Sequence, residues 1–144
     1  MDSISASTIV IILIGVLVAV FVLVVIMYKP PRQLKVHSNF KSGNSENGSI
    51  LEVEIENIGK SSEKIIYPYL KFSTGFHTRK FQVGKEYVNC RYPRILKRGE
   101  KMTCEIDISH YKKLLDKDDF KPTHLTVIVD DMVGMEFKSE LLEV

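Results

Sequence analysis

Residues 49–57 read SILEVEIEN, and this stretch decides the fold class of most of the chain. Leu51, Val53 and Ile55 alternate with glutamates, one apolar and one acidic side chain at a time. A period of two places the apolar side chains on one face of a β-strand and the carboxylates on the other. The stretch therefore predicts a strand with one buried face and one face in water.

The same alternation recurs before and after this strand. Turn-forming residues such as Gly, Asn, Asp and Ser separate the segments. Further strands are predicted over residues 34–40, 64–73, 76–83, 87–90, 101–108, 123–130 and 135–140. Long amphipathic helices, which a parallel α/β fold needs between its strands, do not occur in the sequence. The pattern predicts a mainly β chain with an antiparallel β-sandwich over residues 34–144.

Two segments of this domain carry more specific predictions. In the strand over 64–73, Ile66, Leu70 and Phe72 are expected on the buried face. Pro68 within it predicts a sheet edge or a bulge, because proline cannot donate a ladder hydrogen bond. One short helix is expected after Ser109, which would cap it.

A different pattern fills the N-terminal part of the chain. Residues 9–28 read IVIILIGVLVAVFVLVVIMY, and residues 3–28 contain no Lys, Arg, Asp or Glu. A helix of this length spans about 30 Å, the thickness of the hydrocarbon core of a bilayer. The sequence predicts a transmembrane helix over 9–28, a short N-terminal tail over 1–8 and a Pro-containing linker over 29–33. Within the helix, Gly15 and Ala19 form a small-xxx-small pair that would let a second helix approach closely.

A cleaved signal peptide is the alternative for this segment. Residues 1–8 lack the basic residues that begin such peptides, and no small-residue cleavage site follows the apolar run. The membrane anchor is therefore the favoured interpretation.

The side of the membrane is open. Lys29, Arg32 and Lys35 follow the span, which weakly favours a cytoplasmic domain by the positive-inside rule. Two cysteines and the acceptor triplet at residues 47–49 suit an extracytoplasmic domain instead. Cys90 and Cys104 either form a disulfide, if their strands are neighbours, or remain two buried thiols.

The charges of the domain are distributed unevenly. Residues 71–101 contain nine basic and two acidic residues, whereas residues 102–144 contain five basic and ten acidic residues. Either the two regions pair across the sheet, or the basic one forms an interaction loop for an acidic protein or for anionic lipid heads. The contact residues expected for such a loop are Arg91, Tyr92, Arg94, Lys97 and Arg98.

Several function classes are not expected. The sequence has no serine nucleophile elbow, phosphate-binding loop, dinucleotide fingerprint or zinc-ligand spacing, so no enzyme activity, cofactor or metal is predicted. A net charge of +2 and the lack of a reading module argue against nucleic acid.

Two turn motifs carry a resemblance to a known family. VEIENIGK at 53–60 and LKRGEKMT at 96–103 resemble the turns of microbial immunoglobulin-like β-sandwich domains of the cell-adhesion-related type. The resemblance covers about residues 34–144 and implies an immunoglobulin-like sandwich. The chain has no tryptophan and its cysteines are 14 positions apart, which differs from the antibody-type branch. In architecture alone, a span followed by such a domain is also similar to archaeal filament stator proteins.

These observations predict a single-pass, membrane-anchored accessory or scaffold protein whose β-sandwich binds a partner protein at the membrane surface. The expected partners are the lipid bilayer and a protein or larger membrane complex, and a homo-oligomer is compatible with the sequence. The alternative is an extracytoplasmic envelope or surface-filament component of the stator type.

Overall fold

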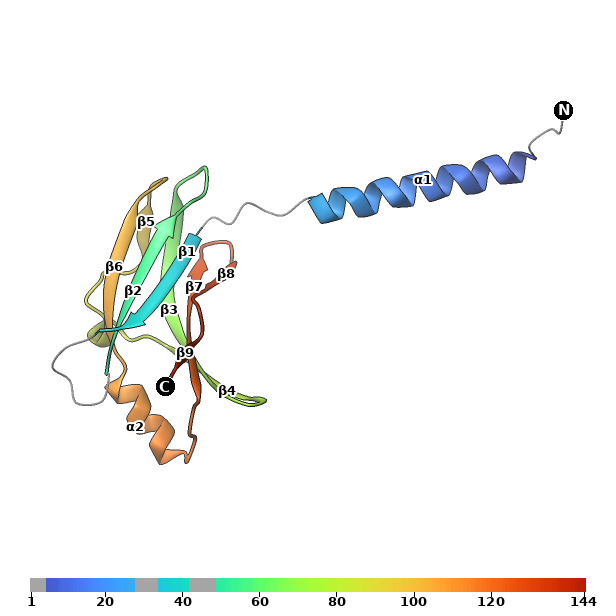
Figure 1. Cartoon of the computed structure of the whole chain (residues 1–144). Coiled ribbons are helices and arrows are strands. Elements are labelled where there is room, and N and C mark those ends of the chain that lie inside the picture. The colour runs from blue at the N-terminus through green and yellow to red at the C-terminus, as the bar shows by residue number, and fades with distance from the viewer. Residues whose placement is uncertain (1–4, 28–33, 42–48) are drawn as a thin grey trace. The chain divides into compact units, whose positions relative to one another are not determined.

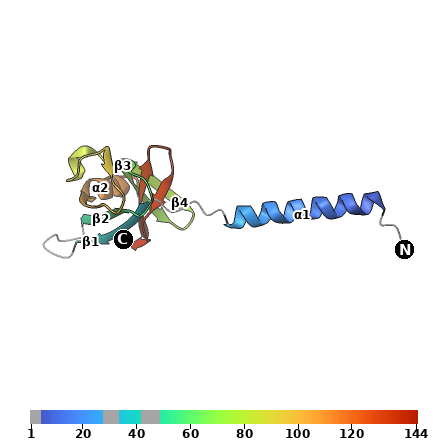
Figure 2. The ribbon, with the colours of Figure 1, turned by 90° about the horizontal axis from the view of Figure 1, so that it is seen from above.

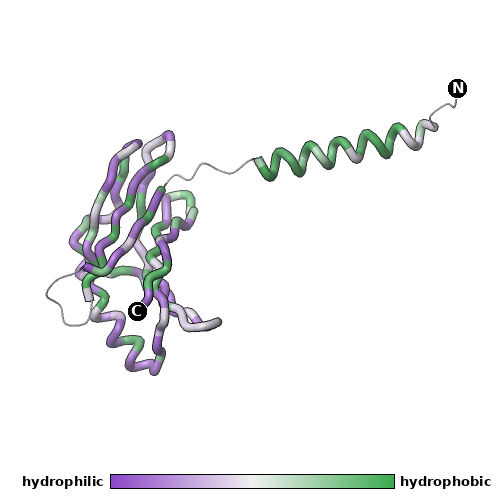
Figure 3. The backbone as a smooth tube through the Cα atoms, in the orientation of Figure 1, coloured by the Kyte–Doolittle hydropathy of each residue, from purple (hydrophilic) through white to green (hydrophobic). Residues whose placement is uncertain are grey.

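The computed structural model describes residues 5–27, 34–41 and 49–144. Two compact units make up the chain, residues 1–31 and residues 32–144. In the first unit, helix α1 (Ala6–Met27) begins three residues before the predicted span, and Tyr28 lies outside the described residues. Its 22 residues form a rod of about 33 Å. Figure 3 shows it as a continuous apolar segment.

Helix α1 buries none of its residues within the chain. It is long and apolar enough to cross a membrane, a property that a signal sequence near an N-terminus shares.

The second unit consists of two open antiparallel sheets (Figures 1 and 2), which confirms the predicted mainly β class. One sheet has the order β1-β2-β6, with β1 (Leu34–Phe40), β2 (Ile50–Asn57) and β6 (Lys101–Asp107). The other has the order β4-β3-β7-β8, with β3 (Glu63–Thr74), β4 (His77–Gln82), β7 (His124–Asp131) and β8 (Glu136–Lys138). Two short strands extend it, because β5 (Arg94–Leu96) pairs with β3 and β9 (Leu142–Glu143) pairs with β7.

Apolar side chains of both sheets form one buried core. The alternation read from residues 49–57 holds, because Leu51, Val53 and Ile55 are buried. The second sheet contributes side chains from β3 and β7 to the same cluster, among them Leu70, Phe72, Leu125, Val127 and Val129. Helix α2 (Ser109–Lys117) closes one end of the core with Tyr111 and Leu115. The domain therefore has a core that owes nothing to α1.

Strand β3 contains the bulge that Pro68 predicts. Ile65 pairs with Asp131 and Pro68 pairs with Val129, so β3 advances three residues while β7 advances two. β3 lies between β4 and β7, which means that Pro68 sits in an interior strand rather than at an edge. The extra residue changes the inward face upstream of the bulge. The prediction that Ile66 is buried is therefore wrong, and Ile65 takes its place.

Two further predictions are wrong in detail. Residues 87–90 do not form a strand: a 3₁₀ helix (Lys85–Tyr87) is followed by a single bridge from Val88 to Ile106. Asn89 donates its backbone N–H to the Glu105 carbonyl at 3.1 Å, but the Glu105 N–H is accepted by the Asn89 side-chain oxygen, at 2.7 Å, rather than by a backbone carbonyl of this segment. Ser109 is the first helical residue rather than the cap, and Asp107 accepts its backbone N–H at 2.9 Å.

Candidate functional site: the loop end of the β domain

Three turns and the start of β1 lie at one end of the β domain, which we call the loop end: Leu34 and residues 58–62, 97–100 and 132–135. The strand register brings them together. Leu34 pairs with Asn57, so the turn after β2 lies beside the start of β1. Glu63 pairs with Leu96, and Ile65 pairs with Asp131, which adds the turns after β5 and β7 (Figure 1).

Asn57 joins two of these turns from a fully buried position. Its side-chain nitrogen donates to the carbonyl oxygens of Leu96, at 2.9 Å, and Ser61, at 2.8 Å. Its side-chain oxygen accepts the Gly59 N–H at 3.0 Å. Its backbone exchanges two more hydrogen bonds with the turn before β6, through the carbonyl of Glu100 and the N–H of Gly99. One residue thus fixes the turn after β2 and the turn after β5 relative to each other.

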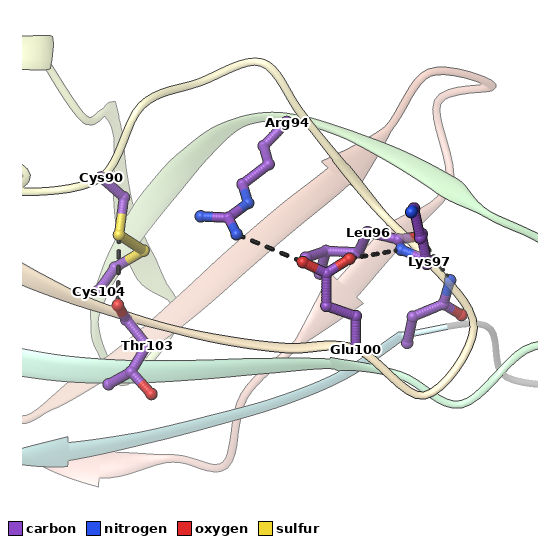
Figure 4. Close-up of polar contacts among 8 residues, drawn as sticks. Cys90, Arg94, Leu96, Lys97, Glu100, Thr103 and Cys104 are labelled. Atoms are coloured by element: carbon purple, nitrogen blue, oxygen red, sulfur yellow. Dashed lines mark hydrogen bonds and ion pairs between the residues drawn. A yellow bond between two sulfur atoms is a disulfide. The ribbon is translucent and has the colours of Figure 1, made fainter.

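Glu100 organises the basic turn (Figure 4). One carboxylate oxygen accepts the Lys97 backbone N–H at 2.8 Å, and the other accepts a guanidinium N–H of Arg94 at 3.3 Å. The Lys97 N–H, and next the Arg94 guanidinium, hold the pKa of Glu100 below its ordinary value. Gly99 completes the turn with a positive φ of 74°, a conformation that favours glycine.

A disulfide joins Cys90 to Cys104 at the other end of this segment (Figure 4). The two Cα atoms are 5.6 Å apart, within the range of ordinary disulfides. Closing a loop of this length contributes about 2–4 kcal/mol to stability. The bond tethers the segment before β5 to β6, so residues 91–99 are held at both ends.

The expected contact residue Tyr92 is not on the surface, and this part of the prediction is wrong. Its side chain is buried in the core, and its hydroxyl lies 3.3 Å from the Cys104 sulfur. Burial raises the pKa of Tyr92 to about 12. The ring is an anchor that holds the segment against β6, and no composition signal separates this role from surface display.

The four expected basic contacts are exposed but are not one cluster. Lys97 and Arg98 lie in the turn at the loop end. Arg94 forms an ion pair with Glu100. Arg91 follows the disulfide, level with the middle of β6, since Cys104 pairs with Val53. The structure therefore brings two of these residues, Lys97 and Arg98, to the same turn.

The exposed apolar side chains at the loop end were not predicted from the sequence. Met132 and Val133 at the tip of the β7–β8 hairpin are 68% and 85% exposed, and Ile58 in the turn after β2 is 47% exposed. Ile95 in β5, just outside the loop end, is 60% exposed. The composition of residues 131–134 predicts a turn, but a turn motif does not say that its apolar residues point away from the core. The sequence signal that could have predicted this exposed tip is the apolar pair Met132-Val133 between the turn-forming residues Asp131 and Gly134.

Gly15 and Ala19 lie four positions apart on α1, and a Cβ added at Gly15 would meet nothing within 4 Å beyond the adjacent helix backbone, so their helix contact stays a prediction. Within residues 5–27, 34–41 and 49–144, no group of three or more metal-ligating side chains gathers.

Comparisons with known proteins assign no family. No family model and no curated protein matches the chain. The structural genomics target SoR45 is 9% identical and has a TM-score of 0.38, with 77% of this chain and 83% of that chain covered. The putative ApaA protein from Bordetella pertussis is 13% identical and has a TM-score of 0.37, with 77% and 88% covered. Likenesses at this level support no inference about function.

Replacing Asn57 tests its structural role. In Asn57→Ala, the carbonyl oxygens of Leu96 and Ser61 lose a donor and the Gly59 N–H loses an acceptor. We expect the free energy of unfolding of residues 32–144 to fall by about 2–4 kcal/mol, measured by urea denaturation. Asn39→Ala, on the exposed face of β1, is the matched control and should change it by less than about 0.5 kcal/mol. Equal effects of the two substitutions would contradict the assigned role.

Proposed function

We propose that the protein is a single-pass, membrane-anchored accessory or scaffold protein whose β domain binds a partner protein at the membrane surface. The observation that carries the proposal is the division of the chain into an apolar helix with no buried residue and a domain with its own core. A helix that buries nothing within its own chain needs an apolar environment elsewhere, and a bilayer provides one. That the protein is not an enzyme stays a prediction.

The β3–β4 hairpin is the surface that best suits a protein partner. Among the described strands, β4 pairs with β3 alone, so its other edge is open to a further strand. Five of its six residues are exposed, and only Phe81 is half-buried. Phe76 at the tip is fully exposed. An open edge beside an aromatic side chain is the arrangement that strand addition uses.

The strand order supports the finer proposal of an immunoglobulin-like domain. The strands β1 and β2 share one sheet with β6, while β3 and β7 are neighbours in the other sheet. Such alternation between sheets is the connectivity of Greek-key sandwiches. The disulfide differs from the antibody-type bond, because it joins β6 to a neighbouring segment rather than one sheet to the other.

One observation favours the extracytoplasmic alternative, an envelope or surface-filament component of the stator type. Disulfides persist in oxidising compartments and are rare in the cytosol. The Cys90–Cys104 bond therefore supports an exported domain, whereas the basic residues after the span support a cytoplasmic one.

The anchor can be tested on native membranes. Because α1 carries no charged side chain, we expect the full chain to remain with the membrane pellet after alkaline extraction. Residues 32–144 alone should be released. The intact mass of the membrane-bound protein distinguishes an anchor from a signal peptide, since cleavage would remove α1. Release of the full chain, or loss of α1 from the mature protein, would overturn the proposal.

The partner surface can be tested by substitution. Phe76→Ser should reduce the recovery of protein partners that purify with the full chain in mild detergent, because it removes the apolar tip of the hairpin. Leu141→Ser, which also alters an exposed apolar residue, is the matched control and should leave recovery unchanged. Unchanged recovery with Phe76→Ser would remove the hairpin from the proposal.

The side of the membrane can be tested through the disulfide. An exported domain predicts that Cys90 and Cys104 resist thiol reagents in cells lysed under denaturing, alkylating conditions, and react after reduction. A cytoplasmic domain predicts that both react without reduction. Blocking of both thiols before reduction would count against the extracytoplasmic alternative.

A further inference from the structure

We propose that the loop end is a docking surface for an anionic bilayer. In this arrangement the tip of the β7–β8 hairpin inserts Met132 and Val133 among the lipids, while Lys60, Lys97 and Arg98 contact anionic head groups. The inference rests on the proposed membrane anchor and adds a second contact between the β domain and the same membrane.

The length of the chain between α1 and β1 limits where the domain can be. Six residues, 28–33, separate Met27 from Leu34 in the sequence. A chain of this length reaches at most about 25 Å. Leu34 belongs to the loop end, so this end stays within that reach of the point where the anchor leaves the lipid. With α1 in the bilayer as proposed, the start of β1 is therefore within about 25 Å of the end of the anchor.

The tip of the β7–β8 hairpin presents exposed apolar side chains that could insert into a bilayer. Met132 and Val133 are 68% and 85% exposed, and they are adjacent. Asp131 fixes the tip, because one of its carboxylate oxygens accepts the backbone N–H groups of Val133, at 2.9 Å, and Met135, at 2.8 Å. Gly134 takes a positive φ of 88° in the same turn. Single exposed apolar residues need no explanation, but Met132 and Val133 are adjacent on a structured tip and form a small apolar patch at the same end as the exposed Ile58.

The charges around this patch match an anionic surface. Its three turns contain the cations Lys60, Lys97 and Arg98, and none of these joins an ion pair among the described residues. Among the carboxylates at these turns, Glu100 is paired with Arg94, Asp131 is buried under the hairpin tip, and Glu63 follows the turn after β2 and accepts the Ser61 hydroxyl. Apolar residues rimmed by cations are typical of surfaces that bind membranes.

A lipid surface fits these observations better than a protein does. A protein bound at the loop end would have to enter the space that the six-residue tether leaves beside the bilayer. The β3–β4 hairpin, at the other end of β3, has no such restriction. Docking of the loop end on lipid therefore leaves Phe76 and the edge of β4 directed to a protein partner.

The absence of tryptophan from the sequence allows a direct test. Val133→Trp places a single indole at the tip of the β7–β8 hairpin, and Phe76→Trp places one at the exposed tip of the β3–β4 hairpin as the matched control. Both full-length proteins are incorporated into vesicles of phosphatidylcholine with phosphatidylglycerol, with and without brominated acyl chains. We expect V133W emission to shift to shorter wavelength and to be quenched by the brominated lipid. F76W emission should remain that of an indole in water.

Charge variants separate the electrostatic part. Replacing Lys60, Lys97 and Arg98 by Gln in the V133W protein should reduce quenching, because each basic residue near an anionic surface shifts the docking equilibrium by about fivefold. Vesicles of phosphatidylcholine alone should likewise reduce the quenching of the V133W protein, because they lack anionic head groups.

The outcomes distinguish the two proposals. A full chain that does not float with vesicles would overturn the anchor and the docking surface together. A chain that floats while V133W stays in water, or while F76W is quenched to the same extent, would overturn the docking surface alone. Quenching of V133W that ignores both the charge variant and the lipid charge would also overturn it.

Discussion

The loop end depends on the side-chain amide of Asn57. A buried amide must satisfy two donor hydrogens and one acceptor oxygen, and Asn57 does so with the carbonyls of Leu96 and Ser61 and the N–H of Gly59. Ser61 and Gly59 lie in the turn after β2, whereas Leu96 ends β5. The hydrogen bonds that satisfy the buried amide therefore also fix the positions of these two segments relative to each other. The loop end is therefore built on one interior polar residue rather than on contacts among the exposed ones.

Two devices keep the segment between the cysteines on the domain. The disulfide fixes one end to β6, and the ring of Tyr92 packs into the core beside it. Glu100 fixes the other end by accepting the Lys97 N–H. A segment restrained in this way presents Lys97 and Arg98 at defined positions with little further loss of conformational freedom on binding. Tyr92 and Glu100 therefore hold the backbone of the segment in place, and Lys97 and Arg98 are exposed on it.

The periodic parts of this fold were predictable, and the singular contacts were not. Strict alternation located β2 and β6, and an uncharged apolar run located α1 to within a few residues. The bulge at Pro68 was foreseeable as a proline effect, but its consequence for Ile66 depends on the register with β7. Composition placed Tyr92 on a surface, because aromatic and basic neighbours look alike in a core anchor and in an interaction loop. Asn57 was predicted only as the last residue of a strand, because its buried hydrogen bonds depend on a second turn that is distant in the sequence.

The β3–β4 hairpin has one more consequence for this architecture. Its outer strand adds only Phe81 to the packed interior, and even that side chain is half-buried. Residues toward the tip are joined to the domain by the ladder with β3 and by two side-chain contacts, from Lys80 to Glu136 and from Arg79 to the Phe120 ring. Insertions, deletions and exchanges there would leave the folded body intact, so this arm is the part of the molecule that is free to diverge when specificity changes.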